Sequence, residues 1–304
     1  NGLQEAVAKN LNASKDTIPI YPNQIGLFNG VDAAIHAIFH AYGDRGDQLL
    51  TTTPTFGYYK PCSAMQGMET VAIPYEGESF HYPLKAIRNE LITRCPKLLI
   101  ICNPNNPTGT RLSADQIISL AKLSPQTLIV VDELYEAFSK DSVLPIIEFK
   151  KSPNILVLRS LSKTAGLAGL RIGFAIGRKD IVDRIKRVTG PYDINSFAVK
   201  AAFAALEDQD YINRYVDEVL KAKEWITSQL ISNQIHHHID GGNYFLVWPK
   251  EATSQVDLAL RSAGILIRDM KGKDLIDGSI RVSIGTVNQM KRFWEAFQES
   301  HKSL

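Results

Sequence analysis

Residues 160–173 read SLSKTAGLAGLRIG, which places one lysine, Lys163, among serines and glycines, with Arg171 eight positions later. A lysine forms a Schiff base with an aldehyde only when its amine is neutral, and a confined, partly desolvated setting lowers the lysine pKa toward that state. The serines, the glycines and a fixed guanidinium would suit a phosphate. The stretch therefore indicates a reactive amine beside an anion site. The alternative is a surface lysine in a glycine-rich loop.

A second group of residues favours the reactive amine. The apolar run from Thr127 to Val131 is followed directly by Asp132, with Tyr135 three residues later. Open α/β sheets place ligand contacts at the carboxyl ends of their strands. Pyridoxal 5′-phosphate joins an aldehyde to a phosphate, and its protein partners are a Schiff-base lysine and an acid on the pyridine nitrogen. We expect Asp132 to be that acid and Tyr135 to bond the ring hydroxyl; the alternative for Asp132 is a helix cap.

Another predicted strand ends at Phe28 and is followed by Gly30, Val31 and Asp32. An amphipathic helix is expected to run from there through Ala33 to Tyr42. Because the first backbone amides of a helix point toward an anion, this helix start is expected to bind a phosphate, aided by the small Gly30.

Two more segments lie at predicted strand ends. Residues 102–109, CNPNNPTG, hold two asparagines between prolines, which would present a rigid amide to a ring oxygen. Asn-Pro and Pro-Thr-Gly also form turns whatever the function. Residues 54–59, PTFGYY, offer Phe56 to stack on a cofactor ring, with core packing as the alternative.

Taken in order, six blocks resemble the signature blocks of fold-type I pyridoxal-phosphate-dependent aminotransferases: NGVDAAI, PTFGYY, NPNNPTG, VVDELYEAF, SLSK and GLRIG. The stretch LRSLSK…GLAGLRIGF is most similar to the histidinol-phosphate aminotransferase group. The resemblance runs from about Leu3 to the C-terminus. It implies an α/β, aspartate aminotransferase-like fold with a mostly parallel central sheet and a smaller C-terminal α+β domain. It also implies a homodimer.

The resemblance assigns a role to each matching residue. Lys163 matches the lysine that carries the cofactor and moves a proton between Cα and C4′, and Asp132 matches the partner of the pyridine nitrogen. Asn106 and Tyr135 match the pair that bonds the ring hydroxyl, while Phe56 takes the stacking place, where the family often has tyrosine. The matches to the phosphate cup are Gly30, Val31, Asp32, Ser160, Ser162 and Arg171.

Three residues near the C-terminus match substrate contacts. Arg281 matches the arginine that forks onto the substrate carboxylate, and a planar guanidinium suits that task through two parallel charge-assisted bonds. From the alternating strand pattern alone, Arg281 would equally point to solvent. Arg268 would meet a second anionic group or, alternatively, pair with Asp269 or Asp274. Asn243 would border the carboxylate pocket.

The predicted function is transfer of an amino group between an amino acid or histidinol phosphate and a 2-oxo acid, typically 2-oxoglutarate, with glutamate as its partner. Decarboxylation of a phosphorylated amino acid and transamination of aromatic amino acids are alternatives on the same scaffold, because function depends on the site. A pyridoxal-phosphate-binding domain of a transcription regulator is an alternative of another class. No basic helix-turn-helix segment supports that alternative.

The order of elements along the 304 residues predicts two domains, residues 1–205 and 206–304. Strand patterns alternate with helical patterns in the first part, as βαβ units require. The strands expected there are Gln24–Phe28, Gln48–Thr52, Glu69–Ile73, Lys97–Cys102, Thr127–Val131, Asn154–Leu158 and Arg171–Ile176. The second part is expected to hold helices over Asp210–Ile231, Ser254–Ala263 and Val287–Glu299, and strands over Gly242–Val247 and near Ile265 and Ile280.

Composition excludes several classes of protein. Apolar residues make up 44% of the chain, charged residues 22%, and the net charge is +2, so neither a nucleic-acid partner nor a membrane partner is expected. Cys62, Cys95 and Cys102 lack metal spacing and predict reduced, mostly buried thiols in a cytoplasmic protein. No metal is expected at His236-His237-His238, because neighbours on an extended segment face opposite ways.

The chain starts at Asn1 without a methionine, inside what resembles the first helix of the large domain. Members of the family carry a segment before this point that closes over the substrate and reaches the partner subunit. The alternatives are a natural gene that is short at this end and a sequence that is part of a longer chain, and we expect the second.

Overall fold

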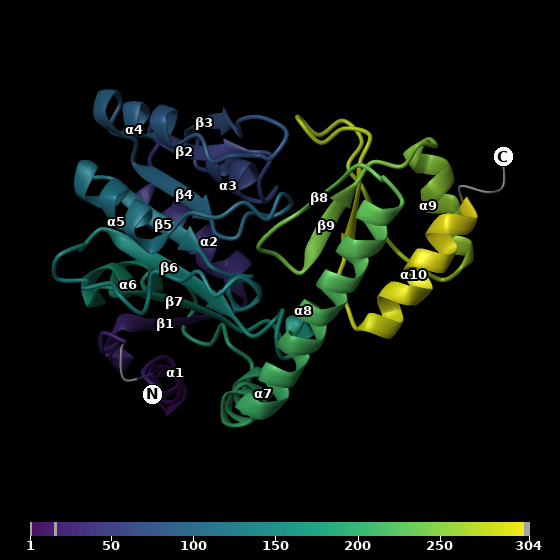
Figure 1. Cartoon of the computed structure of the whole chain (residues 1–304). Helices are drawn as coiled ribbons and strands as arrows, with labels where there is room; N and C mark the ends of the chain where they lie inside the picture. Colours follow the sequence, from purple (N-terminus) through teal and green to yellow (C-terminus); the bar gives the residue numbers. More distant parts are fainter. Residues whose placement is uncertain (1, 15–16, 301–304) are drawn as a thin grey trace.

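The computed structural model describes residues 2–14 and 17–300. Strands within these residues form two sheets, one seven-stranded and one four-stranded. Figure 1 shows them side by side, with the long helix α8 (Gln209–Ser232) running along the four-stranded sheet. The α/β fold with a smaller α+β part at the C-terminus is confirmed.

The larger sheet has the strand order β1-β7-β6-β5-β4-β2-β3. Its strands are β1 (Ile25–Phe28), β2 (Gln48–Thr53), β3 (Glu69–Pro74), β4 (Leu98–Cys102), β5 (Leu128–Asp132), β6 (Ile155–Ser160) and β7 (Gly173–Gly177). Strands β2 to β6 pair in parallel, whereas β7 runs antiparallel to both β6 and β1. Six of the seven strands lie where the sequence predicts them. The seventh was expected to begin at Arg171, but Arg171 has a left-handed φ of 56° and the strand begins only at Gly173.

Helices cover both faces of this sheet, and the burial of β4 shows why its sequence is continuously apolar. Leu98 and Ile100 pack into the cluster with α2, α3 and α6, while Leu99 and Ile101 pack into the cluster with α1, α4, α5 and α7. A strand buried on both faces needs apolar side chains at every position. The first set of helices spans Val31–Tyr42, Tyr59–Met65 and Lys179–Lys186, and the second spans Gly2–Leu11, Leu84–Thr93, Ala114–Leu123 and Ser196–Glu207.

The smaller sheet is antiparallel, with the order β10-β11-β9-β8. Its strands are β8 (His237–Ile239), β9 (Tyr244–Val247), β10 (Arg268–Asp269) and β11 (Ile280–Ser283), and α8, α9 (Thr253–Ser262) and α10 (Val287–Ser300) pack with it. The helices predicted in this part of the chain are confirmed. In the histidine triplet, the ring of His236 stacks on Trp248 and that of His238 lies against Phe80.

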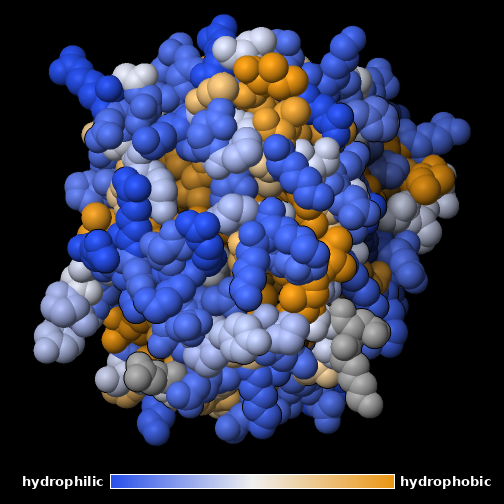
Figure 2. All heavy atoms as spheres, turned by 90° about the vertical axis from the view of Figure 1, so that its left-hand side faces the viewer, coloured by the Kyte–Doolittle hydropathy of each residue, from blue (hydrophilic) through white to orange (hydrophobic). Residues whose placement is uncertain are grey.

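The outer face of the seven-stranded part is mostly hydrophilic, with separate apolar areas near its top and centre (Figure 2). None of the helices built from residues 2–14 and 17–300 is long and apolar enough to cross a bilayer. Cys62 and Cys102 are buried and Cys95 is exposed, all three as free thiols.

Candidate active site

Asp132 is the last residue of β5 and is only 3% exposed. The hydroxyl of Tyr59 donates to its Oδ2 at 2.6 Å, and the backbone N–H of Leu134 donates to its Oδ1 at 3.3 Å. Burial raises the pKa of Asp132 to about 6, even though both hydrogen bonds act to lower it. Burial destabilises the ionised carboxylate of Asp132, and a positively charged partner would stabilise it.

Lys163 lies in the turn after β6, and its Nζ is 5.2 Å from the centre of the Tyr135 ring. Burial lowers the pKa of Lys163, and the positive charge of Arg281 lowers it further, while the carboxylate of Asp132 acts in the opposite sense. The amine is therefore neutral in a larger fraction of molecules than an exposed lysine, as an attack on an aldehyde requires.

The start of α2 forms a tight cradle that only glycine fits. Gly30 has a φ of 80°, and a Cβ placed on it would lie 2.5 Å from the Arg171 guanidinium. A Cβ on Gly173 would lie 2.6 Å from the backbone nitrogen of Val31. No side chain caps the helix at Gly30, so its first amides stay available for an anion.

Polar side chains surround this cradle. Arg171 donates to Asp32 Oδ2 at 2.6 Å, which fixes its guanidinium beside the helix start. The hydroxyls of Ser160 and Ser162 are 2.7 Å apart, and the Ser162 N–H donates to Ser160 Oγ at 3.0 Å. Ser160 pairs in register with Gly173 across β6 and β7, and Gly173 lies against Gly30 and Val31, so the two serines lie close to the start of α2.

The asparagine-rich loop after β4 uses its three amides differently. Asn103 bonds both backbone groups of Leu112, and Asn105 bonds Pro54, Thr55 and Thr108, so these two hold the loop together. The third amide, Asn106, instead lines a cavity next to the loop, and its Oδ1 accepts a hydrogen bond from Arg281 at 2.5 Å. The sequence pattern alone does not separate Asn105 from Asn106.

Arg281 and Arg268 face each other across two strands. They are register partners in the antiparallel pair β10–β11. The Nε of Arg281 is shielded from solvent and has no hydrogen-bond partner within the described residues. Arg268 is exposed, and the alternative ion pair with Asp269 or Asp274 does not occur in this part of the chain. Both arginines line a cavity of about 780 Å³, together with Asn106 and Phe56.

Phe56 is half-buried and meets the ring of Tyr59 edge-on, with centres 5.5 Å apart. Asn243 precedes β9, and its carbonyl accepts a hydrogen bond from the Ile284 N–H at 2.7 Å. Asn243 is not among the residues that line the cavity, so its role as a border of the carboxylate pocket stays a prediction.

Two tyrosines for which the sequence predicts no role lie among these residues. Tyr59 is the hydrogen-bond donor to Asp132. The only hint of this contact in the sequence is its place in the aromatic segment PTFGYY, of which Tyr59 is the last residue. Tyr244 lies edge-on to the ring of Tyr135 at 4.9 Å, and its hydroxyl donates to the carbonyl of Asn105 at 2.5 Å. The Arg281 guanidinium is 5.6 Å from the centre of the Tyr244 ring. Tyr244 therefore links the small sheet to the loop that carries Asn106.

A buried ion pair supports the end of β5. Glu133 is 1% exposed, and its carboxylate accepts from Arg159 Nε at 2.9 Å and from the Val143 N–H at 2.8 Å. Arg159 also pairs with Glu136. Because Glu133 follows Asp132 directly, this pair fixes the backbone from which Asp132 projects.

Comparisons with known proteins point to one family of enzymes. The family model described as aminotransferase class I and II matches residues 1–297. The histidinol-phosphate aminotransferase of Symbiobacterium thermophilum is 31% identical over 271 residues, which cover 89% of this chain and 74% of that protein.

Two crystal structures share the fold. One is the histidinol-phosphate aminotransferase of Sinorhizobium meliloti in complex with pyridoxal 5′-phosphate, with a TM-score of 0.86 and 24% identity over 99% of this chain and 81% of that one. The other is L-threonine-O-3-phosphate decarboxylase of Porphyromonas gingivalis, with a TM-score of 0.80 and 24% identity over 99% and 89%.

Proposed function

The chain belongs to the class I and II aminotransferases, which use pyridoxal 5′-phosphate, and we propose that its amino donor is histidinol phosphate or a closely related phosphorylated amino compound. The acceptor in this proposal is a 2-oxo acid, typically 2-oxoglutarate, which leaves as glutamate. The similarity to histidinol-phosphate aminotransferases and the four cationic side chains that line the cavity support the choice of a phosphorylated donor.

The residues present fit this cofactor. The cradle at Gly30, with the free amides of α2 and the Arg171 guanidinium, suits the phosphate. The raised pKa of Asp132 suits a carboxylate that gains stability when a protonated pyridine nitrogen pairs with it. The Tyr135 hydroxyl has no partner within the described residues, which leaves it free, with the Asn106 amide, for the ring hydroxyl.

Once bound, pyridoxal 5′-phosphate supplies an aldehyde for the amino group and an electron sink for the bond to the Cα proton. Lys163 would accept that proton as a general base, because its lowered pKa keeps part of the amine neutral. Its Nζ would then return the proton to the neighbouring carbon. Asp132 would keep the pyridine nitrogen protonated.

Arg281 would orient carboxylate substrates. Its guanidinium is held by Asn106 on one side and by the Tyr244 ring on the other, and its Nε still lacks a partner. A carboxylate that bridges Nε and the second terminal nitrogen would satisfy that donor through a two-point contact.

The observation that carries the proposal is the shared environment of Lys163, Asp132 and Arg281. Lys163 lies within electrostatic reach of both other residues, although the three lie far apart in the sequence. Borohydride reduction of the cofactor-loaded protein, followed by peptide mapping, is expected to find the pyridoxyl mass on the peptide that contains Lys163. A label on another lysine would refute the assignment. Mixing the protein with histidinol phosphate, phosphothreonine, phenylalanine and glutamate would then identify the donor by its change in cofactor absorbance.

One further activity has specific support. The decarboxylase of Porphyromonas gingivalis shares the fold, and the cationic cavity would also suit a phosphorylated amino acid. Release of carbon dioxide from phosphothreonine, without formation of a 2-oxo acid, would show decarboxylation in place of transamination.

We also propose that residues 1–205 and 206–304 are two domains and that the protein is a cytoplasmic homodimer. The separate sheets support the division, which would then fall within α7. Phe197 at the start of α7 and Tyr192 in the loop before it are 82% and 93% exposed and supply an apolar surface for a second subunit. Analytical ultracentrifugation of the cofactor-loaded protein would test the dimer.

A further inference from the structure

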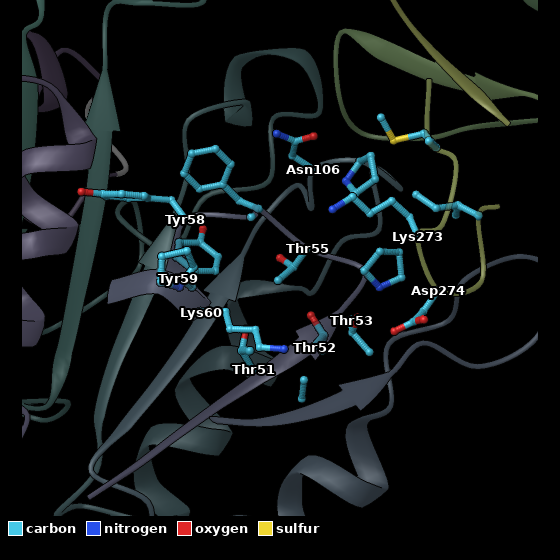
Figure 3. Close-up of a pocket in the computed structure, with 18 of the residues that line it drawn as sticks. Thr51, Thr52, Thr53, Thr55, Tyr58, Tyr59, Lys60, Asn106, Lys273 and Asp274 are labelled. Carbon is cyan, nitrogen blue, oxygen red and sulfur yellow. The ribbon is translucent and has the colours of Figure 1, made fainter. Parts of the chain in front are cut away.

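Asn106 and Arg281 line the same cavity but come from different sheets. Asn106 follows β4 of the large sheet, whereas Arg281 belongs to β11 of the small sheet. In the view of Figure 3, Asn106 lies between Tyr58 and Lys273, which belong to opposite walls of the cavity. The hydrogen bond between Asn106 and Arg281 does not by itself fix how the two sheets lie, because both side chains can turn about several torsions.

A second set of contacts joins the loop after β4 to the small sheet. The N–H of Gly241 donates to the carbonyl of Gly109 at 3.0 Å. Arg111 bridges two carboxylates, because its Nε donates to Asp240 Oδ1 at 2.9 Å and a terminal nitrogen donates to Asp141 Oδ2 at 2.8 Å. Asp141 lies between β5 and β6, and Asp240 lies between β8 and β9, so Arg111 ties the two sheets together. We call these five residues the clasp.

The two backbones of the clasp approach so closely that a larger residue would displace one of them. Gly109 has a φ of 78°, and a Cβ placed on it would lie 3.0 Å from the nitrogen of Gly241. A Cβ on Gly241 would lie 2.5 Å from Cδ of Arg111 and 2.9 Å from the Gly109 carbonyl oxygen. The stem of Arg111 therefore lies directly against Gly241. Lys223 of α8 donates to the carbonyl of Asp240, which ties the same segment to that helix.

The clasp continues into the contacts at the cavity. Positions 105, 109 and 111 of the loop bond positions 244, 241 and 240 in turn, so the two segments run side by side in opposite directions. Arg281 is the register partner of Leu246 on β9, which begins at Tyr244. A shift of β9 along the loop would therefore carry Arg281 with it and change its distance from Asn106.

We propose that Arg111 is a positioning residue, which through the clasp holds Arg281 against Asn106 and within electrostatic reach of Lys163. Arg111 itself does not line the cavity of Arg281, so it acts only through the residues that it ties together. The proposal rests on the proposed function, because Arg281 and Lys163 are the residues assigned there to the substrate carboxylate and to the cofactor.

The amine of Lys163 reports the position of Arg281. Burial is the largest cause of the lowered pKa of Lys163, and the charges of Arg281 and Arg171 lower it further, whereas Asp132 and Asp32 raise it. Arg281 acts more strongly on this pKa than Arg171 does. Movement of Arg281 away from Lys163 would therefore raise the pKa of the amine.

Two variants loosen the clasp in different ways. Arg111→Met removes both ion pairs, and Gly241→Ala pushes the Arg111 stem aside. Arg261→Met is the matched control, because it removes an ion pair within α9 whose arginine side chain is 53% exposed, against 43% for Arg111. Labelling of the cofactor-free proteins with acetic anhydride over a range of pH, read by peptide mass spectrometry, gives the pKa of Lys163. We expect this pKa to rise in both clasp variants and to stay unchanged in the control.

Reaction of the cofactor-loaded proteins with glutamate, followed by stopped-flow absorbance, supplies the second measurement. The apparent second-order rate constant should fall by about three- to tenfold in the clasp variants, mainly because the half-saturating glutamate concentration rises. In an Arg281→Met background, Arg111→Met should change neither the Lys163 pKa nor the glutamate reaction further, since the two residues act through one another.

An unchanged Lys163 pKa in both clasp variants, or full addition of the Arg111 and Arg281 effects, would overturn the proposal. A failure of the proposed function looks different. The cofactor-loaded parent would then not react with glutamate, whereas the labelling of Lys163 in the cofactor-free proteins would still decide whether the clasp holds Arg281 in place.

Discussion

Replacement of Asp132 by asparagine is expected to stabilise the cofactor-free protein. The pKa of the buried carboxyl is raised from 3.8 to about 6, and one pH unit corresponds to about 1.36 kcal/mol. Ionised Asp132 therefore costs the folded state up to about 3 kcal/mol above pH 6. Asparagine keeps the shape and can still bond Leu134, while the Tyr59 hydroxyl turns to accept from the new amide.

The pH dependence separates this charge effect from any packing effect. Below about pH 4 the carboxyl is protonated in both the folded and the unfolded chain, so it carries no penalty. Between about pH 4 and 6 the folded protein keeps a proton that the unfolded chain has lost, and its stability falls as the pH rises. The stabilisation by Asp132→Asn should therefore be largest at pH 8 and vanish near pH 4.

Urea unfolding of the cofactor-free proteins at pH 4, 5 and 8 measures the difference. The exposed Asp217→Asn, on α8, is the matched control and should show no such trend. With cofactor bound, the order should reverse, because only the carboxylate pairs with the pyridine nitrogen. An Asp132→Asn protein that is no more stable than the parent at pH 8, or whose gain is the same at pH 4, would refute the reasoning.

Three other substitutions give distinct results. Tyr244→Phe keeps the ring but loses the hydrogen bond to the Asn105 carbonyl. In steady-state kinetics kcat/KM should fall by about three- to tenfold, and in urea unfolding the free energy of unfolding should fall by only about 0.5–1.5 kcal/mol, the usual contribution of one hydrogen bond. Arg159→Met leaves Glu133 buried and unpaired and should destabilise the protein by about 3–5 kcal/mol in urea, most of which a second change, Glu133→Gln, should restore. Gly30→Ala at φ 80° should raise the cofactor Kd by tenfold or more in a fluorescence titration, whereas a value equal to that of the parent would exclude a phosphate there.

The sequence was sufficient to predict the residues at strand ends. Asp132 directly follows a continuously apolar run, and parallel strands bring their carboxyl ends to one edge, so its neighbourhood with Lys163 follows from local patterns. The same reasoning placed Gly30 at a helix start, which the structure bears out.

Contacts between distant segments could not be predicted in this way. Tyr59 bonds Asp132 across 73 residues of sequence and Tyr244 bonds Asn105 across 139. Each contact depends on how distant elements pack, and no local sequence pattern predicts that packing. Arg171 was expected both to begin a strand and to belong to the phosphate cup. Its left-handed backbone keeps it out of the strand, whereas its guanidinium does lie at the helix start, where it bonds Asp32. Lys60 and Lys273 both line the cavity of Arg281, but no motif marks either of them in the sequence, and only the fold brings them together.

The segment between β10 and β11 lines the cavity but lies apart from the residues assigned to the cofactor, so under the proposed function the donor and the cofactor would be held by separate parts of the chain. Lys273 and Asp274 lie on this connection, whereas Lys163 and Asp132 lie at the edge of the large sheet. Surface connections accept insertions and exchanges far more readily than strands buried on both faces. A lineage of such enzymes would therefore be able to acquire a new donor by rewriting one short loop, while the reacting lysine and its surroundings stay as they are.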